Sequence, residues 1–266
     1  MPRRPKLGQH FLSSLHYRER IAGALDIRPD DLVVEIGAGR GALTELLAKC
    51  ARRVVAIELD SSLAGELKDK FRSDPGVEVL HADVLLTDIA GLCRDELCKD
   101  CVVFGNLPYY ITSPILHHLL NFRTSIRGMA LLMQREVAER ITARPGTRDY
   151  GYLSVLVHLY SQPRLLFSVP PGAFSPPPKV QSALVGFRMS PKFPHWTRDE
   201  EQDFLEFSKR CFAHKRKNLV NNISPQWLRN RVIEALRVLE LEPNSRAEQL
   251  SLAKLTSLHK LLKQQG

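Results

Sequence analysis

The chain has 266 residues, of which 44% are hydrophobic, and it carries a formal net charge of +9. This length suits one α/β domain with a small additional piece. No apolar run reaches the roughly 18 residues that span a bilayer, and no apolar signal-peptide core follows the N-terminus. We therefore expect a cytoplasmic protein that does not enter membranes.

The excess positive charge lies at the two ends of the chain. The first 20 residues carry five Lys/Arg and one acid, residues 21–191 carry nineteen of each, and residues 192–266 carry fourteen basic and nine acidic groups. A neutral central region with basic ends favours binding of a polyanion. The alternative is that these charges serve only general solubility, and composition does not distinguish the two. We interpret the basic N-terminus as a surface arm rather than a transit peptide.

Apolar runs alternate with helical patterns over the first half of the chain. We expect strands at 32–36, 54–58, 77–80, 101–105 and 129–134. Helical spacing of apolar residues predicts helices over 41–50, 61–71 and 113–122, with further helices after 134. This alternation indicates a mostly parallel, doubly wound sheet in an α/β domain.

The pattern changes after Gln162. Segments 163–169 and 182–189 both have strand character, but the proline-rich connection between them is too short and stiff for a crossover helix. We therefore expect an antiparallel last strand in a seven-stranded sheet. From Pro191 onward the sequence predicts only amphipathic helices, over 200–212, 226–239 and 252–264. The predicted domains are 1–190 and a small all-helical domain, 191–266.

Three of the five cysteines, Cys93, Cys98 and Cys101, have a spacing that occurs in iron–sulfur proteins. No fourth ligand is evident, and Cys101 opens a predicted buried strand, where it would pack as a small apolar residue. We expect no metal site, and the sequence leaves any role of these thiols open.

The segment "EIGAGRGA" (35–42) turns from the first strand into a helix. Glycines such as Gly37 and Gly39 allow close approach of a ligand to the backbone, and Glu58, 19 residues after Gly39, can accept hydrogen bonds from ribose hydroxyls. The same pattern satisfies the dinucleotide fingerprint. The loop therefore predicts a nucleoside cofactor, either a nicotinamide dinucleotide or S-adenosylmethionine, with a purely structural turn as the alternative.

Two acidic residues at neighbouring strand ends favour S-adenosylmethionine. Glu35 precedes the first glycine, and Asp83 follows the third strand, where it can accept from an adenine amino group. S-adenosylmethionine has no pyrophosphate and offers an amine, ribose hydroxyls and an adenine amino group, which suit acceptors. Asp83 could equally cap a helix.

The segment "FGNLPYYITSP" (104–114) places a polar amide where the fourth strand ends. The side-chain oxygen of Asn106 and the carbonyl of Leu107 form an acceptor pair that can bind an exocyclic amine and draw its lone pair out of the ring plane. Pro108 stiffens this carbonyl, and Tyr109 offers a ring on which a base can stack. The alternative is a turn with packed tyrosines.

The chain resembles the small-subunit ribosomal RNA adenine dimethyltransferases. The motifs that carry this resemblance occur in family order and span nearly the whole chain: "LGQHFL" (7–12), "EIGAGRGALT" (35–44), "NLPYYITSPIL" (106–116), "YGYLSVL" (150–156), "GAFSPPPKVQSALV" (172–185) and "RAEQLSLAKLTSLHKLL" (246–262). The resemblance implies a Rossmann-like class I methyltransferase fold and S-adenosylmethionine as methyl donor. It also implies N6,N6-dimethylation of two adjacent adenosines near the 3′ end of 16S rRNA within the immature small subunit.

By position, the resemblance implies two sets of site residues. The cofactor set is His10, Leu12, Gly37, Gly39, Glu58, Leu59, Asp83, Val84 and Asn106. The target base would be held by Asn106, Leu107, Pro108, Tyr109 and, stacking on its other face, Phe174, whose alternative role is to anchor a loop. Separately, the charge pattern predicts that Arg3, Arg4, Lys6, Lys179, Lys215, Arg216 and Lys217 contact RNA, with a solvated helix end as the alternative for the last three. The family often has Asn where this chain has His10.

Three other functions compete with this interpretation. A large-subunit (23S) adenine methyltransferase of the macrolide-resistance type is the nearest, although Pro114 and the 150–156 motif favour the small-subunit group. A mitochondrial transcription factor of the same ancestry would bind without catalysis. A nicotinamide oxidoreductase would need a hydride-transfer acid or base, which the sequence does not suggest. No dimerisation stripe is evident, so we expect a monomer.

Overall fold

The structure is a computed structural model that describes residues 9–94 and 99–264. The chain forms two compact units. The first unit contains the chain up to Ala138 together with Gln162–Met189, and the second contains Glu139–Ser161 and the chain from Ser190 onward. The helical unit therefore also includes residues 139–161, which the sequence analysis assigned to the first domain.

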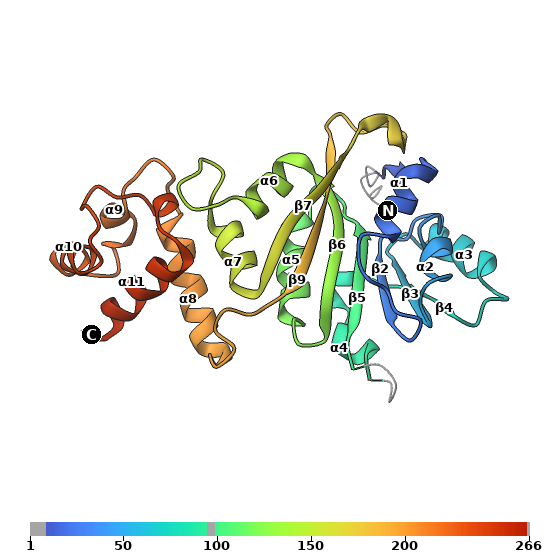
Figure 1. Cartoon of the computed structure of the whole chain (residues 1–266), viewed down its shortest axis with the longest axis horizontal. Helices are drawn as coiled ribbons and strands as arrows, with labels where there is room; N and C mark the ends of the chain where they lie inside the picture. Colours follow the sequence, from blue (N-terminus) through green and yellow to red (C-terminus); the bar gives the residue numbers. More distant parts are fainter. Residues whose placement is uncertain (1–8, 95–98, 265–266) are drawn as a thin grey trace, which may run out of the picture. The chain divides into compact units, whose positions relative to one another are not determined.

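The first unit is built on a seven-stranded sheet (Figure 1). Its strands, in spatial order, are β4 (Val77–His81), β3 (Arg53–Glu58), β2 (Leu32–Ile36), β5 (Cys101–Asn106), β6 (Ile126–Gln134), β9 (Ser182–Met189) and β7 (Ser161–Val169). The five strands from β4 to β6 pair in parallel, and β9 pairs antiparallel with β6. The predicted mostly parallel sheet with an antiparallel last strand is confirmed.

The central strands are apolar because both of their faces are covered. All five residues of β2 are buried, as are the residues of β3 from Val54 to Glu58. The intervening helices are α2 (Thr44–Leu47), α3 (Ser61–Lys70) and α5 (Thr112–Asn121). α2 is shorter than the predicted 41–50, because the glycine loop before it has positive φ angles up to Gly41 and cannot join a right-handed helix.

A second, two-stranded sheet was not predicted. β1 (Phe11–Leu12) pairs antiparallel with β8 (Phe174–Ser175), and helix α1 (Leu15–Ala22) follows β1. The backbone N–H groups of Ser13 and Ser14 both donate to the carbonyl of Ala173, within the short 3-10 helix η2 (Pro171–Ala173). These bonds join the start of the described chain to the loop between β7 and β9.

The second unit is helical. Its elements are α7 (Tyr152–Tyr160), α8 (Arg198–Cys211), α9 (Leu219–Ile223), α10 (Arg229–Val238), the 3-10 helix η3 (Ala247–Gln249) and α11 (Leu252–Gln264), and α6 (Arg135–Thr142) leads into it. The three predicted C-terminal helices are confirmed, and the described residues beyond Met189 contain no strand. A capping box of Thr197 and Glu200 begins α8. Within the described ranges, no helix is long and apolar enough to cross a bilayer.

Candidate active site

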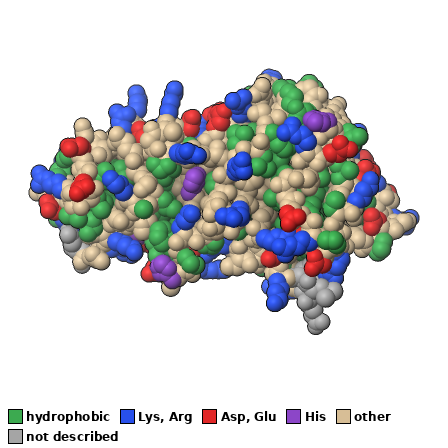
Figure 2. Space-filling model, in the orientation of Figure 1, with side chains coloured by type: hydrophobic (Ala, Val, Ile, Leu, Met, Phe, Trp, Pro, Cys, Tyr) green, Lys and Arg blue, Asp and Glu red, His purple; other side chains and the backbone are tan. Residues whose placement is uncertain are grey.

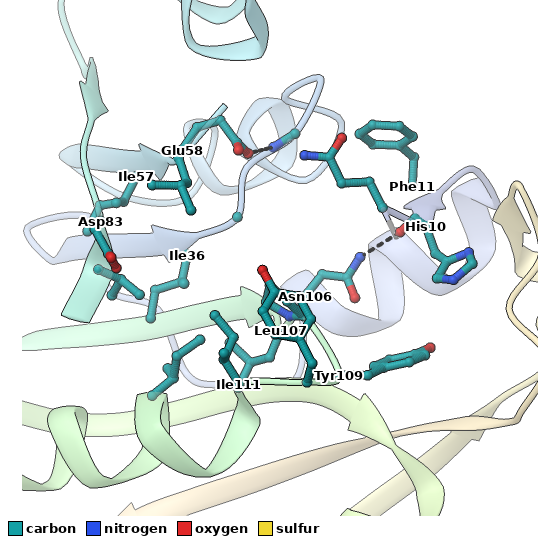
Figure 3. A pocket seen from close by; sticks show the side chains of 18 of the residues that line it. His10, Phe11, Ile36, Ile57, Glu58, Asp83, Asn106, Leu107, Tyr109 and Ile111 are labelled. Carbon is teal, nitrogen blue, oxygen red and sulfur yellow. Dashed lines mark hydrogen bonds between the residues drawn. The ribbon is translucent and has the colours of Figure 1, made fainter. Parts of the chain in front are cut away.

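A pocket of about 880 Å³, its open mouth included, lies at the carboxyl ends of β2, β3 and β5 (Figure 3). The chain order of the strands reverses between β2 and β5, since β3 and β4 lie on one side and β6, β9 and β7 on the other. Ligands of doubly wound sheets bind at such a reversal. The described start of the chain, with Gln9, His10 and Phe11, also lines the pocket.

The glycine loop contributes backbone to the pocket, but most of its N–H groups already have partners. Gly37 and Ala38 donate to the carbonyl of Ile57, Gly41 donates to the carbonyl of Ala38, and Gly39 donates to Oε2 of Glu58 at 2.8 Å. The N–H groups of Arg40, Ala42 and Leu43, next to the start of α2, are not among these. The loop by itself therefore fits either a pyrophosphate or a ligand without one.

Acceptor oxygens line the pocket at the ends of β3 and β4. Glu58 is 5% exposed, and its two oxygens accept one backbone hydrogen bond each, from Gly39 and Asp60. Each carboxylate oxygen has a second lone pair, so Glu58 can still accept two ribose hydroxyls. Asp83 caps the 3-10 helix η1 (Val84–Leu86) by accepting from Leu85 N–H at 2.9 Å through Oδ1. Its Oδ2 accepts no hydrogen bond among the described residues.

Glu35 lies beneath the glycine loop and does not line the pocket. It accepts a hydrogen bond from the hydroxyl of Thr44 at 2.5 Å. The pKa of Glu35 is raised to about 8, chiefly by burial and also by the nearby Glu58 carboxylate, against the opposing effects of the Thr44 hydrogen bond and of Lys70. Glu35 therefore supports the loop from inside the protein rather than offering a free acceptor to a ligand.

Asn106 ends β5 at the floor of the pocket. Its side-chain Nδ2 donates to the backbone carbonyl of His10 at 2.9 Å (Figure 3). Since Nδ2 is held in this way, the amide orientation is fixed, and Oδ1 accepts no hydrogen bond from the described residues. Leu107 N–H donates to the carbonyl of Leu132, while the Leu107 carbonyl likewise has no donor within the described chain. Two neutral acceptor oxygens therefore lie side by side in sequence at this strand end.

Tyr109 stands beside these acceptors. Its hydroxyl is 2.6 Å from the hydroxyl of Ser182 on β9, and its ring stacks with the imidazole of His10 at a centroid distance of 5.9 Å. Burial raises the pKa of Tyr109, and the hydrogen bond with Ser182 opposes this shift. The phenol is therefore neutral at physiological pH. The carbonyl of Pro108 accepts from Ile111 N–H and the Thr112 hydroxyl, which ties the turn to the start of α5.

Most residues of the predicted cofactor and base sets lie together in this pocket. They are His10, Gly37, Gly39, Glu58, Leu59, Asp83, Val84, Asn106, Leu107, Pro108 and Tyr109. Leu12 and Phe174 do not line it. Leu12 packs against the core cluster to which Phe174 belongs, and Phe174 is only 4% exposed. In this conformation the Phe174 ring is a core residue and has no free face for a base.

Eight further residues that line the pocket were not among the predicted site residues: Gln9, Phe11, Ile36, Ile57, Ala82, Tyr110, Ile111 and Ile115. The motifs at 7–12 and 106–116 contain five of these eight residues. Their apolar side chains suit a purine ring, whereas polar chemistry alone pointed only to the acceptors.

Four of the seven basic residues assigned to RNA lie in the described part of the chain, and all four are exposed. Lys179 is exposed in the loop after β8, and Lys215, Arg216 and Lys217 are exposed in the turn between α8 and α9. Of the phenylalanines that precede this turn, Phe204 and Phe207 are buried and Phe212 is half-buried. Figure 2 shows Lys and Arg side chains projecting into solvent over much of one face. The remaining three candidates, Arg3, Arg4 and Lys6, lie outside the described residues.

The cysteines do not form a metal site within the described chain. Cys93 and Cys101 are buried thiols outside any disulfide, and their sulfur atoms lie 3.3 Å from the carbonyl oxygens of Ile89 and Ser125, respectively. Cys98 lies outside the described residues. No group of three or more His, Cys, Asp or Glu residues positioned to hold a metal ion occurs among the residues that the structure describes.

The sheet order, the antiparallel β9 and the pocket at the strand reversal define a Rossmann-like class I methyltransferase fold. Two solved structures share this fold over nearly their whole length. A dimethyladenosine transferase from Plasmodium falciparum has a TM-score of 0.79 at 25% identity, covering 94% of this chain and 96% of that chain. The 23S rRNA methyltransferase ErmE has a TM-score of 0.72 at 27% identity, covering 95% and 99%.

Sequence comparison narrows this class to one family. The family profile described as "Ribosomal RNA adenine dimethylase" matches residues 2–264. A ribosomal RNA small subunit methyltransferase A from Acidobacterium capsulatum is 42% identical, covering 97% of this chain and 91% of that protein. The protein of the same name from Geobacter metallireducens is 40% identical, covering 97% and 95%. The chain belongs to the ribosomal RNA adenine dimethylase family.

Proposed function

We propose that this protein transfers methyl groups from S-adenosylmethionine to the N6 atoms of two adjacent adenosines near the 3′ end of 16S rRNA, dimethylating both during late assembly of the small ribosomal subunit. The observation that carries the proposal is the pair of neutral acceptor oxygens at Asn106 and Leu107 beside the acceptor-lined pocket. We further propose that the protein acts as a cytoplasmic monomer on the immature subunit.

The residues of the pocket fit S-adenosylmethionine. Glu58 retains lone pairs for ribose hydroxyls, and the unpartnered Oδ2 of Asp83 suits an adenine amino group. Apolar side chains such as Ile57 and Val84 line the same pocket and can contact a purine. When bound, the donor supplies an electrophilic methyl carbon on a sulfonium. No metal is needed, because the sulfonium already carries the charge that drives transfer.

Asn106 and Leu107 prepare the nucleophile. The adenine amine is a poor nucleophile because its lone pair is delocalised into the ring. Two acceptors that bind its hydrogens favour a pyramidal nitrogen whose lone pair points away from them. Since Nδ2 of Asn106 donates to the His10 carbonyl, the orientation of the amide is set and its oxygen remains available to an incoming amine. A carboxylate at this position would add charge beside an uncharged base.

The second methyl transfer uses the same acceptors. A monomethylated amine retains one hydrogen, which one acceptor can hold after rotation about the C6–N6 bond. The proton released at each step can pass to solvent, so the mechanism requires no strong base. The pocket contains no group that must be protonated for transfer, and the neutral phenol of Tyr109 serves as a stacking surface.

The competing functions have less support. The relatives named for the small subunit are 37–42% identical to this chain, against 27% for the 23S enzyme ErmE. The match of residues 2–264 to the ribosomal RNA adenine dimethylase family argues against a nicotinamide oxidoreductase. A transcription factor that acts only by binding has no need of the acceptor pair at Asn106 and Leu107.

The decisive experiment uses the purified protein, isotopically labelled S-adenosylmethionine and immature small ribosomal subunits, followed by mass spectrometric mapping of the modified nucleosides. We expect N6,N6-dimethyladenosine at two adjacent positions near the 3′ end of 16S rRNA. Large subunits serve as the matched control. Label on 23S rRNA alone would assign the protein to the large-subunit group, and absence of label with tight RNA binding would favour a non-catalytic role.

A further inference from the structure

The hydroxyl of Tyr109 has one hydrogen-bond partner among the described residues, the hydroxyl of Ser182. The two oxygens lie 2.6 Å apart, which is short for a bond between hydroxyl groups but within the normal range. The residues are 73 positions apart in the chain. Tyr109 lines the pocket, whereas Ser182 is not among the described residues that line it. Ser182 therefore contacts the phenol without entering the space in which a ligand binds.

Ser182 is the polar exception in a buried apolar strand. The first six residues of β9 are buried, and the three that follow Ser182, namely Ala183, Leu184 and Val185, are apolar and fully buried. Ser182 is 0% exposed. Burying a hydroxyl in apolar surroundings costs stability unless the group finds a partner. The phenol of Tyr109 is the partner that this strand provides for.

The backbone around Ser182 is fixed. Ser182 is in register with Gln134, the last residue of β6. One residue earlier, the carbonyl of Gln181 accepts from the N–H of Arg135 at 2.9 Å, and its side-chain oxygen accepts from the Arg135 guanidinium at 2.9 Å. Hydrogen bonds therefore hold the chain on both sides of the hydroxyl, and Ser182 is a rigid point of attachment for the Tyr109 ring.

The Tyr109 ring needs such an attachment to serve as a stacking surface. Rotation about the bond that joins a tyrosine ring to its Cβ is loosely restrained, and packing covers only part of this half-buried residue. A hydrogen bond at the far end of the ring restrains that rotation. Without the Ser182 hydroxyl the phenol would lack a partner, and turning toward water in the open pocket would restore one.

We propose that Ser182 is a positioning residue for methyl transfer, whose hydroxyl holds the phenol of Tyr109 and thereby fixes the ring on which the target adenine stacks. The inference rests on the proposed function, and it adds a residue that contacts neither the base nor the methyl donor. Ser182 should consequently affect transfer only through Tyr109.

A double-mutant cycle with immature small subunits tests this dependence. Ser182→Ala should lower the single-turnover rate constant by about 5- to 100-fold, between the loss of a weak stacking contact and the effect of misplacing the base by about 1 Å. In the Tyr109→Phe background, where no phenol remains to be held, the same substitution should change the rate constant by less than about twofold.

Binding should not follow the rate. The dissociation constants of Ser182→Ala for the subunit and for S-adenosylmethionine should stay within about twofold of the wild-type values, since phosphate contacts dominate RNA affinity and Ser182 lies outside the pocket lining. Ser161→Ala is the matched control. Ser161 begins β7 as Ser182 begins β9, is 1% exposed, and donates to the Val157 carbonyl at 2.9 Å, away from Tyr109. Its rate constant should stay within about twofold of the wild-type value.

Nuclear magnetic resonance of the phenol gives a readout that does not depend on catalysis. The chain has six tyrosines, which can be labelled with ¹³C at Cζ, and the Tyr109 signal is the one that disappears in Tyr109→Phe. We expect Ser182→Ala to shift this signal and Ser161→Ala to leave it unchanged. Urea unfolding of every variant establishes that it is folded under the conditions of the assay.

Two results would overturn the assignment of Ser182. One is an equal loss of rate from Ser182→Ala in the wild-type and Tyr109→Phe backgrounds, which would mean that the hydroxyl acts on the fold and not on the ring. The other is a Ser182→Ala variant with an unchanged rate constant or an unchanged Tyr109 signal. If the wild-type protein methylates no adenosine, the proposed function fails, and the resonance comparison alone then confirms or refutes the link between Ser182 and Tyr109.

Discussion

Asn106→Ala removes one of the two acceptors on which the proposed chemistry depends. The backbone at this position should persist, because Asn106 is held in β5 in register with Leu132 of β6. The folded protein loses one partly buried hydrogen bond, from Nδ2 to the His10 carbonyl, which costs about 1 kcal/mol of stability. The effect on transfer should be larger, because the acceptor acts where charge develops on the amine. Loss of one such preorganised group lowers kcat by about 10²–10³.

The assay compares single-turnover methyl transfer with the affinity for small subunits. RNA affinity should change by less than about twofold, since phosphate contacts dominate it and Asn106 makes none. Asn106→Asp is the matched variant, because it keeps the shape but sets a carboxylate oxygen against the His10 carbonyl, where Nδ2 donated at 2.9 Å. We expect it to be about as inactive as the alanine variant. Parallel loss of transfer and RNA binding, or full activity in either variant, would refute the assigned role.

Glu35, Gly41 and the basic turn supply three further tests. The pKa of Glu35 is raised from 4.5 to about 8, so between these pH values the folded protein keeps a proton that the unfolded chain releases. The contribution of this protonated carboxyl to the free energy of unfolding is therefore complete below pH 4.5 and is lost as the pH rises toward 8. Urea unfolding should show a decline of up to about 1.4 kcal/mol per pH unit that is absent in Glu35→Gln; equal slopes would contradict the buried proton. Gly41→Ala should lower the free energy of unfolding by about 1–3 kcal/mol, because the φ of Gly41 is +72° and an added Cβ would lie 2.7 Å from the side chains of Leu67 and Phe71. An unchanged urea midpoint would contradict this packing. Charge reversal at Lys215, Arg216 and Lys217 should weaken RNA binding and reduce its salt slope by about one for each phosphate that these side chains neutralise, whereas an unchanged slope would place them away from the RNA.

The sequence alone determined the sheet and the chemical nature of the site. Buried parallel strands need apolar residues on both faces, so β2, β3 and β5 are visible as short apolar runs. Because such strands end at one edge of the sheet, Glu58, Asp83 and Asn106 could be expected to meet there. These features follow from local patterns and from a rule of topology.

Tertiary structure alone decided which rings and hydrogen bonds complete the pocket. His10 is 96 residues from the Asn106 amide that it orients and 166 residues from the Pro176 carbonyl that holds its ring. No periodic pattern records such distant contacts, because they depend on the path of the chain between elements. For the same reason the sequence showed Phe174 only as an aromatic residue in a proline-rich loop, whereas burial in the core removes both faces of its ring from a base.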